Sequence, residues 1–314
     1  MKPKGYSGGT FLNFPNAEAR CIIKPYKKRK GGFYMEYVVL DNGIKMPQLG
    51  YGVYQVDAAE CERCVGDAIG AGYRLIDTAQ AYGNEEGVGN AVAKSGLPRS
   101  EFFLVTKIWI SNAGYEKAKA SIDESLKKLK TDYVDLLLIH QPFGDYYGTY
   151  RAMEEAYKQN KVRAIGVSNF YPDRLIDLVH FSEIPPMVNQ VETHPFNQQV
   201  TARPYMDKYH VQIMSWGPFA EGKNNMFHNE VLTEIANKYK KTVAQVILRF
   251  LLQSGVVVIP KSTHKERMEE NIDVFDFVLL EEDMDKIRAL DTAQSLFFSH
   301  SDPATVEWFM QLER

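Results

Sequence analysis

The sequence predicts an α/β fold, a (β/α)8 TIM barrel with an N-terminal β-hairpin. Eight short apolar segments alternate with stretches of helical spacing, which indicates parallel strands joined by helical crossovers. The chain has 314 residues, which accommodates one barrel of about 250 residues. No linker rich in proline, glycine or serine divides the body of the chain. Residues 35–314, including the C-terminal tail, are therefore expected to form a single domain.

The β-hairpin is expected first along the chain. An apolar run at residues 37–40 is followed by Asp41, Asn42 and Gly43, and then by a segment around Met46. Asn-Gly is a strong signal for a two-residue hairpin turn. The eight barrel strands are then expected at residues 49–52, 73–76, 102–106, 134–139, 164–167, 187–191, 211–215 and 256–259.

The helices between the strands are marked by caps and by apolar spacing. Asp57 and Glu60 have the spacing of a capping box at the start of the first helix. Thr242 and Gln245 have the same spacing before an apolar helix that is expected to stop at Gly255. On a lysine-rich segment, apolar residues recur with helical spacing at Ala118, Ile122, Leu126 and Leu129.

The three cysteines, Cys21, Cys61 and Cys64, cannot all be paired within the chain, and their number fits a reducing compartment. The spacing of Cys61 and Cys64 also occurs in redox dithiols. Both fall on the apolar stripe of the first helix, so we interpret them as packing residues. A zinc site would need further soft ligands nearby, which the chain does not supply, and no metal site is expected.

Charge is distributed unevenly along the chain. Residues 1–34 carry eight lysines and arginines against Glu18 alone, a net charge of +7, so the other 280 residues carry −10 within the total of −3. An acidic body does not suit nucleic-acid binding, which needs basic groups across the folded surface. We expect residues 1–34 to form a flexible basic extension. A role of this segment in targeting, or in binding an anionic surface, is the alternative.

The lengths and positions of the apolar runs indicate whether the chain crosses a membrane or is secreted. None is long enough to cross a bilayer, and none follows the initial basic residues as a secretory signal would require. A cytoplasmic protein without a membrane partner is therefore expected.

Polar side chains follow the predicted strands directly, at the end of the barrel where such folds carry their chemistry. Asp77 follows the second strand, with Tyr82 in the same loop, while Lys107 and His140 follow the next two. Corresponding positions farther along the chain hold Ser168, Asn169, Gln190, Ser215, Trp216, Lys261 and Ser262. An acid, a phenol, an ammonium and an imidazole can thus meet at one mouth of the barrel.

Together these groups can protonate a carbonyl oxygen while its carbon is reduced. A phenol has an ordinary pKa of about 10, which a nearby ammonium lowers, and we expect Lys107 to act on Tyr82 in this way. A buried ammonium needs a carboxylate partner, for which Asp77 is the candidate. His140 can hydrogen-bond to a substrate oxygen or relay protons. Singly, each residue also has a purely structural interpretation; their joint placement favours the catalytic one.

Several motifs in order resemble those of the aldo-keto reductase family. They read GYRLIDTAQAYGNE at residues 72–85, TKIW at 106–109, LIH at 138–140, GVSN at 166–169 and IPKS at 259–262. The resemblance runs from about residue 35 to residue 291, and it is greatest to the bacterial 2,5-diketogluconate reductase-like and prostaglandin F synthase-like members. Independent motifs in the right order are far more specific than a single glycine motif.

The resemblance implies NADPH-dependent reduction of aldehydes or ketones to alcohols on this barrel, by a monomer acting on small molecules. It implies a catalytic tetrad of Asp77, Tyr82, Lys107 and His140, with Tyr82 as the general acid. Cofactor-binding positions are Ser168, Asn169, Gln190, Ser215 and Trp216, the last matching an aromatic residue that stacks on the nicotinamide ring. Tyr54, Trp109 and His140 are implied to contact substrate, with Phe143 a further wall of the pocket.

The choice of NADPH over NADH also has physical support. Lys261 and Ser262 precede a helix expected to start near His264, and Arg267 lies one turn later. Backbone N–H groups, a hydroxyl and two cations would then face one anion, which suits the extra phosphate of NADPH. The resemblance adds Glu270 and Asn271 on the adenine side, and Glu270 leaves use of both cofactors open.

Two regions depart from the family pattern or vary within it. The loop at residues 218–226 is short and would cover the cofactor less completely than in some relatives. The tail at residues 295–314 carries aromatic residues that would shape the pocket, namely Phe297, Phe298, Trp308 and Phe309. Sugars, ketoacids, methylglyoxal, quinones and aliphatic aldehydes all remain possible substrates. The alternative functions are an NADP(H)-binding regulatory or sensor protein with slow turnover, and an isomerase of phosphorylated substrates.

Overall fold

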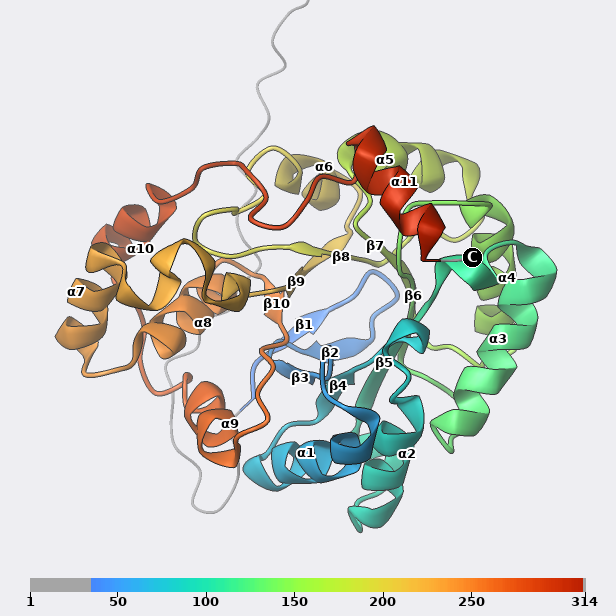
Figure 1. The fold of residues 1–314 in the computed structure, drawn as a ribbon, viewed down its shortest axis with the longest axis horizontal. Helices are drawn as coiled ribbons and strands as arrows, with labels where there is room; N and C mark the ends of the chain where they lie inside the picture. Colours follow the sequence, from blue (N-terminus) through green and yellow to red (C-terminus); the bar gives the residue numbers. More distant parts are fainter. Residues whose placement is uncertain (1–34, 313–314) are drawn as a thin grey trace, which may run out of the picture.

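The computed structural model describes residues 35–312, which form the expected barrel of parallel strands surrounded by helices (Figure 1). The prediction of a (β/α)8 fold with an N-terminal hairpin is confirmed. The basic segment at residues 1–34, with Cys21, lies outside the described residues, so its role stays a prediction.

The eight barrel strands are paired in parallel in chain order. The barrel closes between its first and last strands, where Leu49 pairs with Val258 and the Val258 N–H donates to the Gln48 carbonyl at 2.9 Å. Each strand overlaps one of the predicted segments. The strands are β3 (Gly50–Gly52), β4 (Leu75–Asp77), β5 (Phe103–Ile108), β6 (Leu136–Ile139), β7 (Ile165–Ser168), β8 (Val188–Glu192), β9 (Gln212–Trp216) and β10 (Val257–Val258).

Helices on the outside of the barrel bury their apolar stripes against the strands (Figure 1). They are α1 (Ala58–Ala71), α2 (Glu85–Lys94), α3 (Tyr115–Lys128), α4 (Tyr146–Lys158), α5 (Pro172–Phe181), α6 (Arg203–Lys208), α7 (Glu230–Tyr239), α8 (Val243–Gln253), α9 (Lys265–Ile272) and α10 (Glu281–Arg288). The last helix, α11 (Pro303–Gln311), belongs to the C-terminal tail. Short 3-10 helices interrupt three of the loops, at η1 (Gln80–Tyr82), η2 (Arg99–Glu101) and η3 (Ile110–Asn112). A further segment, η4 (Ala220–His228), is kinked, because its backbone is not helical from Glu221 to Asn225.

The predicted helix starts are partly confirmed. Thr242 and Gln245 form the expected capping box on α8, because each side chain accepts a hydrogen bond from the other residue's backbone N–H. Asp57 caps α1 by accepting from the Ala59 N–H at 2.9 Å. The capping box predicted there is wrong, since the Glu60 carboxylate pairs with Arg63 one turn later at 2.7 Å.

Cys61 and Cys64 are free thiols, fully buried on the inner face of α1. They belong to the core cluster between the helices and the barrel. Burial raises the pKa of the Cys61 thiol to about 12, so it is protonated near neutral pH and a poor nucleophile. The interpretation of these cysteines as packing residues is confirmed.

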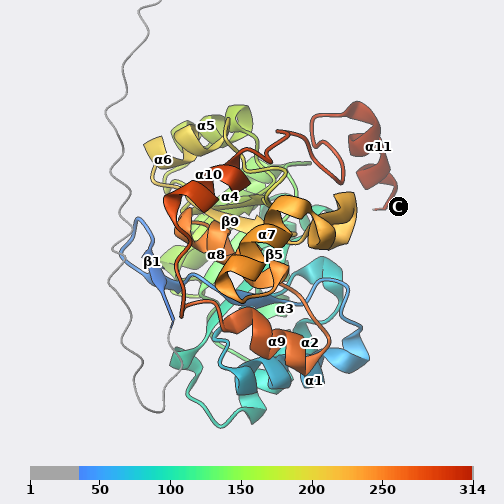
Figure 2. The same ribbon diagram turned by 90° about the vertical axis from the view of Figure 1, so that its left-hand side faces the viewer.

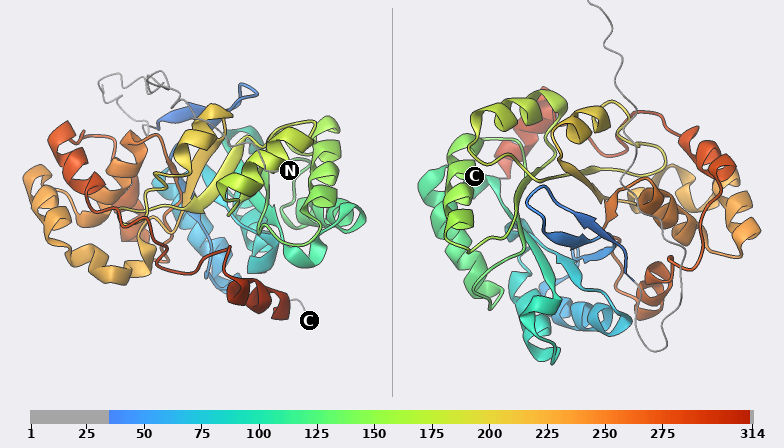
Figure 3. Two further views of the ribbon diagram at one scale, coloured as in Figure 1. Left: turned by 90° about the horizontal axis from the view of Figure 1, so that it is seen from above. Right: turned by 180° about the vertical axis from the view of Figure 1, so that it is seen from behind.

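The N-terminal hairpin closes one end of the barrel. Its strands are β1 (Tyr37–Val39) and β2 (Lys45–Pro47), and Leu40 and Met46 pack into the core of the barrel interior. Figure 3 shows the hairpin lying across the barrel opening.

The turn of this hairpin differs from the prediction. Its loop has three residues, because the Leu40 N–H donates to the Ile44 carbonyl at 2.9 Å and encloses Asp41, Asn42 and Gly43. Gly43 alone has a positive φ, of 83°. A glycine with positive φ in the third position lets a three-residue loop match the twist of the two strands. A two-residue type I′ turn would instead need positive φ at both of its central residues.

The C-terminal tail lies at the other end of the barrel. In Figure 2 the hairpin and α11 stand on opposite sides of the molecule. The loops that follow the carboxyl ends of the strands therefore open under the tail, while the hairpin blocks the far end. None of the helices in residues 35–312 is both long and apolar enough to span a membrane.

Candidate active site

Strand periodicity places the candidate residues on the inside of the barrel. Successive inward-facing side chains are two residues apart on a strand. Leu75, Val105 and Leu138 fill the barrel interior, so Asp77, Lys107 and His140 extend the same inward rows toward the open end. The same step of two leads from Gly166 to Ser168, Val188 to Gln190, Met214 to Trp216 and Ile259 to Lys261.

These rows end in a cavity of about 1120 Å³. Its walls include all but two of the residues predicted to act in catalysis, to bind the cofactor or to contact substrate: Tyr54, Asp77, Tyr82, Trp109, His140, Ser168, Asn169, Gln190, Trp216, Lys261, Ser262, Arg267 and Asn271. The two exceptions are Lys107, which lies buried beneath the cavity floor, and Ser215. Phe143, expected as a wall, lies outside the lining and packs behind the tail against Phe309, with ring centroids 5.4 Å apart.

Ser215 faces away from the cavity. It stands between the inward-facing Met214 and Trp216, and its hydroxyl donates to the Thr193 carbonyl at 2.6 Å. Its side chain is fully buried in this arrangement. The structure therefore does not bring the Ser215 hydroxyl to the cofactor-binding residues, for the same period-two reason that brings Trp216 there.

A buried ion pair forms the floor of the site. The Lys107 ammonium lies 2.5 Å from Asp77 Oδ1 and donates to the Thr78 carbonyl at 2.9 Å. Asp77 Oδ2 accepts from the Gln190 amide at 2.9 Å, so both carboxylate oxygens are engaged. Burial lowers the pKa of Lys107, and the Asp77 carboxylate opposes that shift. Asp77 thus keeps a cation in place where water is excluded.

Tyr82 reaches this ion pair from the 3-10 helix after β4. Lys107 Nζ lies 3.4 Å from the Tyr82 hydroxyl. Burial, followed by the charge of Asp77 and the neighbouring Tyr54, raises the pKa of Tyr82 well above its ordinary value. The pKa of Tyr82 is thus raised and not lowered as expected, because burial disfavours the phenolate and the charge of Asp77 adds to that effect. The phenol holds its proton throughout the neutral range.

His140 stands beside the phenol. Its ring packs edge-on against Tyr82, with centroids 5.5 Å apart, and against Trp109 at 5.0 Å. Burial, then the charge of Lys107, lowers the pKa of His140 well below its ordinary value. Nδ1 of His140 is buried without a hydrogen-bond partner within residues 35–312. A neutral imidazole here can donate one hydrogen bond to a substrate oxygen without competing for the proton.

An amide cluster lines the cavity between β6 and β9. Trp216 Nε1 donates to Asn169 Oδ1 at 2.7 Å, and Asn169 Nδ2 lies 3.2 Å from both the Ser168 hydroxyl and Gln141 Oε1. Asn169 adopts a left-handed backbone conformation, with φ of 64°, which asparagine tolerates better than most residues. Because Asn169 directly follows β7 and has this backbone conformation, its side-chain amide points into the cavity.

The far end of the cavity is cationic. Lys261 and Arg267 line it from both sides of the turn into α9, and neither forms an ion pair with another residue of the described range. Ser262 closes that turn, because its Oγ accepts from the His264 N–H at 3.0 Å. The Glu270 carboxylate accepts from the Thr242 hydroxyl at 2.9 Å, while the buried Asn271 lines the cavity beside it.

The C-terminal tail supplies an aromatic wall to the other end. Phe298, Trp308 and Phe309 line the cavity opposite Trp109, and the rings of Trp109 and Phe309 are 6.2 Å apart. The prediction that the tail helps to shape the pocket is confirmed. The loop over the cavity also takes part, since Lys223 Nζ lies 3.6 Å from the centre of the Phe297 ring.

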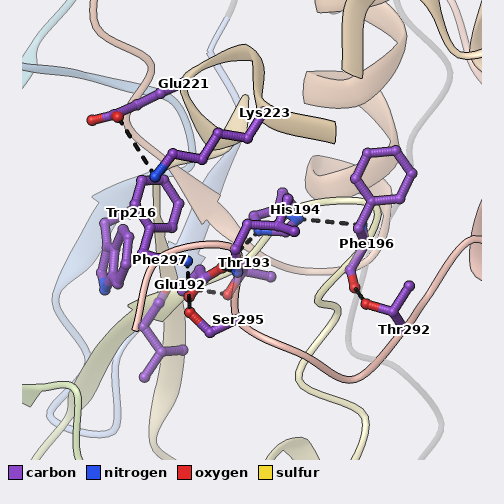
Figure 4. A network of polar contacts seen from close by, with 12 residues as sticks. Glu192, Thr193, His194, Phe196, Trp216, Glu221, Lys223, Thr292, Ser295 and Phe297 are labelled. Carbon is purple, nitrogen blue, oxygen red and sulfur yellow. Dashed lines mark hydrogen bonds and ion pairs between the residues drawn. The ribbon is translucent and has the colours of Figure 1, made fainter. Parts of the chain in front are cut away.

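A buried carboxylate anchors the root of the tail (Figure 4). Glu192, at the end of β8, accepts from the Ser295 hydroxyl at 2.5 Å, the Leu296 N–H at 2.9 Å and His194 Nε2 at 2.9 Å. Burial opposes ionisation, but these hydrogen bonds outweigh it and lower the pKa of Glu192. His194 is fully buried and has a structural role here as a partner of this carboxylate. The clamp holds Phe297 against Trp216, with ring centroids 5.1 Å apart.

Sequence reasoning missed Gln141, Glu192 and His300. Gln141 bridges Asn169 and His300, with its Oε1 3.2 Å from Asn169 Nδ2 and 2.8 Å from His300 Nε2. Glu192 could have been found, because it continues the inward row of Gln190 by two residues. His300 could not, since its contact with Gln141 joins positions 159 residues apart.

Comparison with known proteins agrees with this architecture. The family model for the aldo/keto reductase family matches residues 43–292. The glyoxal reductase of Bacillus subtilis is 50% identical over 256 residues, covering 81% of this chain and 92% of the relative. The methylglyoxal reductase of Escherichia coli is 39% identical over 262 residues, covering 82% and 94% respectively.

A solved structure matches over most of its length. The Bombyx mori aldo-keto reductase in complex with NADP superposes with a TM-score of 0.80 at 34% identity, covering 87% of this chain and 97% of that one. The barrel, the hairpin at its closed end and the match over residues 43–292 thus lead to one conclusion. The chain belongs to the aldo/keto reductase family.

Proposed function

We propose that the protein is an NADPH-dependent oxidoreductase that reduces aldehyde or ketone carbonyls to alcohols, with Tyr82 as general acid. One observation carries the proposal: a protonated phenol opens onto the cavity with a buried ammonium 3.4 Å from its oxygen. Such a pair can release a proton to a developing alkoxide and then stabilise the phenolate that remains.

The chain's own groups account for each proton movement. His140 donates a hydrogen bond that orients the substrate carbonyl oxygen toward the Tyr82 hydroxyl. As the carbonyl oxygen becomes an alkoxide, it takes the phenolic proton, since an alkoxide is the stronger base. The negative charge then lies on Tyr82, next to Lys107. Asp77 keeps Lys107 in position, 2.5 Å away.

The residues that line the cavity fit NADPH. When bound, this cofactor supplies the hydride that reduces the carbonyl carbon. Ser168, Asn169 and Gln190 offer donors and acceptors for a carboxamide, and the Trp216 indole offers a flat face for a ring. At the far end of the cavity, Lys261 and Arg267 provide two cations that form no ion pair in the described range. They suit the extra phosphate that distinguishes NADPH from NADH.

The pocket also favours small or apolar carbonyl substrates. Trp109, Phe298 and Phe309 surround the space above Tyr82 with aromatic surface, which binds hydrocarbon groups and leaves the reactive oxygen to polar groups. The relatives named glyoxal reductase and methylglyoxal reductase support small dicarbonyls as the first candidates to test.

The test is NADPH oxidation, followed by nicotinamide absorbance, over a panel of aldehydes, ketones and dicarbonyls, repeated with NADH. We expect turnover that falls by about 10²–10⁴ in Tyr82→Phe. Tyr37→Phe, in the hairpin at the far end of the barrel, is the matched control and should retain native turnover. Tight NADPH binding without Tyr82-dependent turnover would instead favour the sensor function.

Cofactor choice has its own test. Removing one charge-assisted contact costs about 1.5–3 kcal/mol, so Arg267→Ala should weaken NADPH binding by at least about tenfold. NADH binding should change little, because NADH lacks the phosphate. Lys265→Ala, on the same helix but outside the cavity lining, is the control. Equal losses for both cofactors would contradict the assignment of Arg267 to the phosphate.

A further inference from the structure

The C-terminal tail places a histidine against the amide cluster of the site. His300 is 5% exposed, and its ring stacks on Phe309 at a centroid distance of 6.0 Å with planes 21° apart. His300 Nε2 lies 2.8 Å from Gln141 Oε1. Gln141 in turn lines the cavity between His140 and Asn169. A residue from the tail thus contacts Gln141, which in turn contacts Asn169, one of the residues that would face the nicotinamide.

The hydrogen bonds in this cluster have one consistent direction. The indole N–H of Trp216 can only donate, so the Asn169 atom at 2.7 Å is its amide oxygen. Asn169 therefore directs its NH2 group at the Gln141 atom 3.2 Å away, which must be an acceptor. Because that atom is the Gln141 oxygen, His300 has to donate to it.

This direction fixes the state of His300. Its proton sits on Nε2, and burial lowers the pKa of the ring to about 4, so the histidine is neutral at neutral pH. The Gln141 oxygen then accepts from two sides, from His300 on the tail and from Asn169 at the end of β7. With its carbonyl held by two donors, the Gln141 side chain has little freedom to turn away from Asn169.

We propose that His300 is a positioning residue for the cofactor site: its Nε2–H holds the Gln141 carbonyl, which holds the Asn169 amide that binds the nicotinamide carboxamide. This inference rests on the proposed function, and it extends it by linking the tail to cofactor binding. His300 acts through Gln141, so its loss should weaken NADPH binding and leave the proton donor Tyr82 intact.

The link is also reciprocal. The segment that carries His300 carries Phe298 and Phe309, which form the substrate wall. If an ordered tail strengthens cofactor binding, bound cofactor must by the same free energy favour the ordered tail. The substrate wall should consequently be best formed when NADPH is already bound.

The test compares two substitutions of the same side chain. His300→Phe keeps a stacking ring but removes the donor, whereas His300→Gln keeps an N–H at a similar reach. NADPH dissociation constants are measured by quenching of tryptophan fluorescence, together with kcat and KM for an aldehyde. We expect His300→Phe to weaken NADPH binding about three- to tenfold. His300→Gln should stay within about twofold of the native chain, with kcat within about twofold in both.

A double-mutant cycle separates positioning from packing. In a Gln141→Ala background, His300→Phe should cause no further loss of NADPH affinity, because the group that it holds is gone. If His300→Phe does not fold, Gln141→Leu tests the same link from its other end, with the same three- to tenfold loss expected.

Two results overturn the inference. One is native NADPH affinity in His300→Phe or Gln141→Leu; the other is an equal loss in His300→Gln and His300→Phe, which would mean that the residue only packs. Failure of the proposed function looks different, because the native chain would then bind no NADPH or turn over no carbonyl, whatever residue occupies position 300.

Discussion

The ion pair beneath Tyr82 gives the sharpest test of the site. In Asp77→Asn, Lys107 keeps the Thr78 carbonyl at 2.9 Å but loses the carboxylate at 2.5 Å. Breaking a buried pair by removing one partner costs about 3–5 kcal/mol. The alternative for the variant is to deprotonate Lys107, which costs about 1.4 kcal/mol for each pH unit below its ordinary pKa of about 10.4, or about 5 kcal/mol at pH 7. The two routes agree on the size of the loss.

The pH dependence of this loss has a definite sign. In Asp77→Asn the folded chain holds Lys107 with a lowered pKa, so the unfolded chain binds the extra proton. Its stability therefore rises with pH, and the deficit against the native chain should be largest at pH 7 and shrink toward pH 10.

Denaturant unfolding at pH 7 and pH 9.5 measures both quantities. The matched control is Asp77→Asn combined with Lys107→Met, which removes the isolated charge and should recover most of the stability but none of the NADPH oxidation. Both variants should lose turnover, because the phenolate of Tyr82 is no longer stabilised. Two results would refute the reasoning. One is a loss of unfolding free energy in Asp77→Asn below about 1 kcal/mol, far under the cost of an isolated buried charge. The other is a loss in this variant that does not change with pH.

Three further predictions concern the tail, the barrel wall and the pocket. Because the pKa of Glu192 is lowered in the folded chain, its carboxylate stabilises the fold at pH values above the unfolded pKa of about 4.3. Thermal scans at pH 7 should therefore show a lower unfolding temperature for Glu192→Gln than for the native chain. This difference in unfolding temperature should vanish as the pH falls below 4. A Cβ at Gly166 would lie 2.4 Å from the Val188 carbonyl, so Gly166→Ala should cost about 1–3 kcal/mol in denaturant unfolding. Gly70→Ala, with open space around it on α1, should instead be neutral or slightly stabilising. Phe309→Ala should raise KM for an aldehyde about tenfold while kcat holds, which steady-state kinetics would show; a fall in kcat alone would contradict a binding role.

Much of the fold and site could be predicted because both depend on strand periodicity. Apolar runs of strand length located all eight strands, and the polar residue that ends each inward row was visible in the sequence. Asp77, Lys107 and Trp216 were found in this way. Periodicity also explains why the Ser215 hydroxyl does not face the cavity: Ser215 occupies the alternate position on its strand, and its hydroxyl donates to the Thr193 carbonyl within the wall.

The remaining features depend on contacts that no local pattern encodes. His300 meets Gln141 only because the tail crosses the open end of the barrel. The pKa of Tyr82 is raised mainly by burial, and then by the charges of Asp77 and Tyr54, which spacing alone does not reveal. Glu60 has the spacing for a capping box, yet a nearby arginine competes for its carboxylate.

The way the barrel closes has a consequence for its synthesis. Leu49 and Val258 lie 209 residues apart at the first and last strands of the barrel, and their pairing completes the ring of strands. A nascent polypeptide that has not yet released β10 from the ribosome must therefore carry β3 and β9 as open edges, ready to pair with other chains. Slow elongation beyond the last strand would expose these edges longest, so aggregation during expression should depend on how quickly β10 leaves the ribosome.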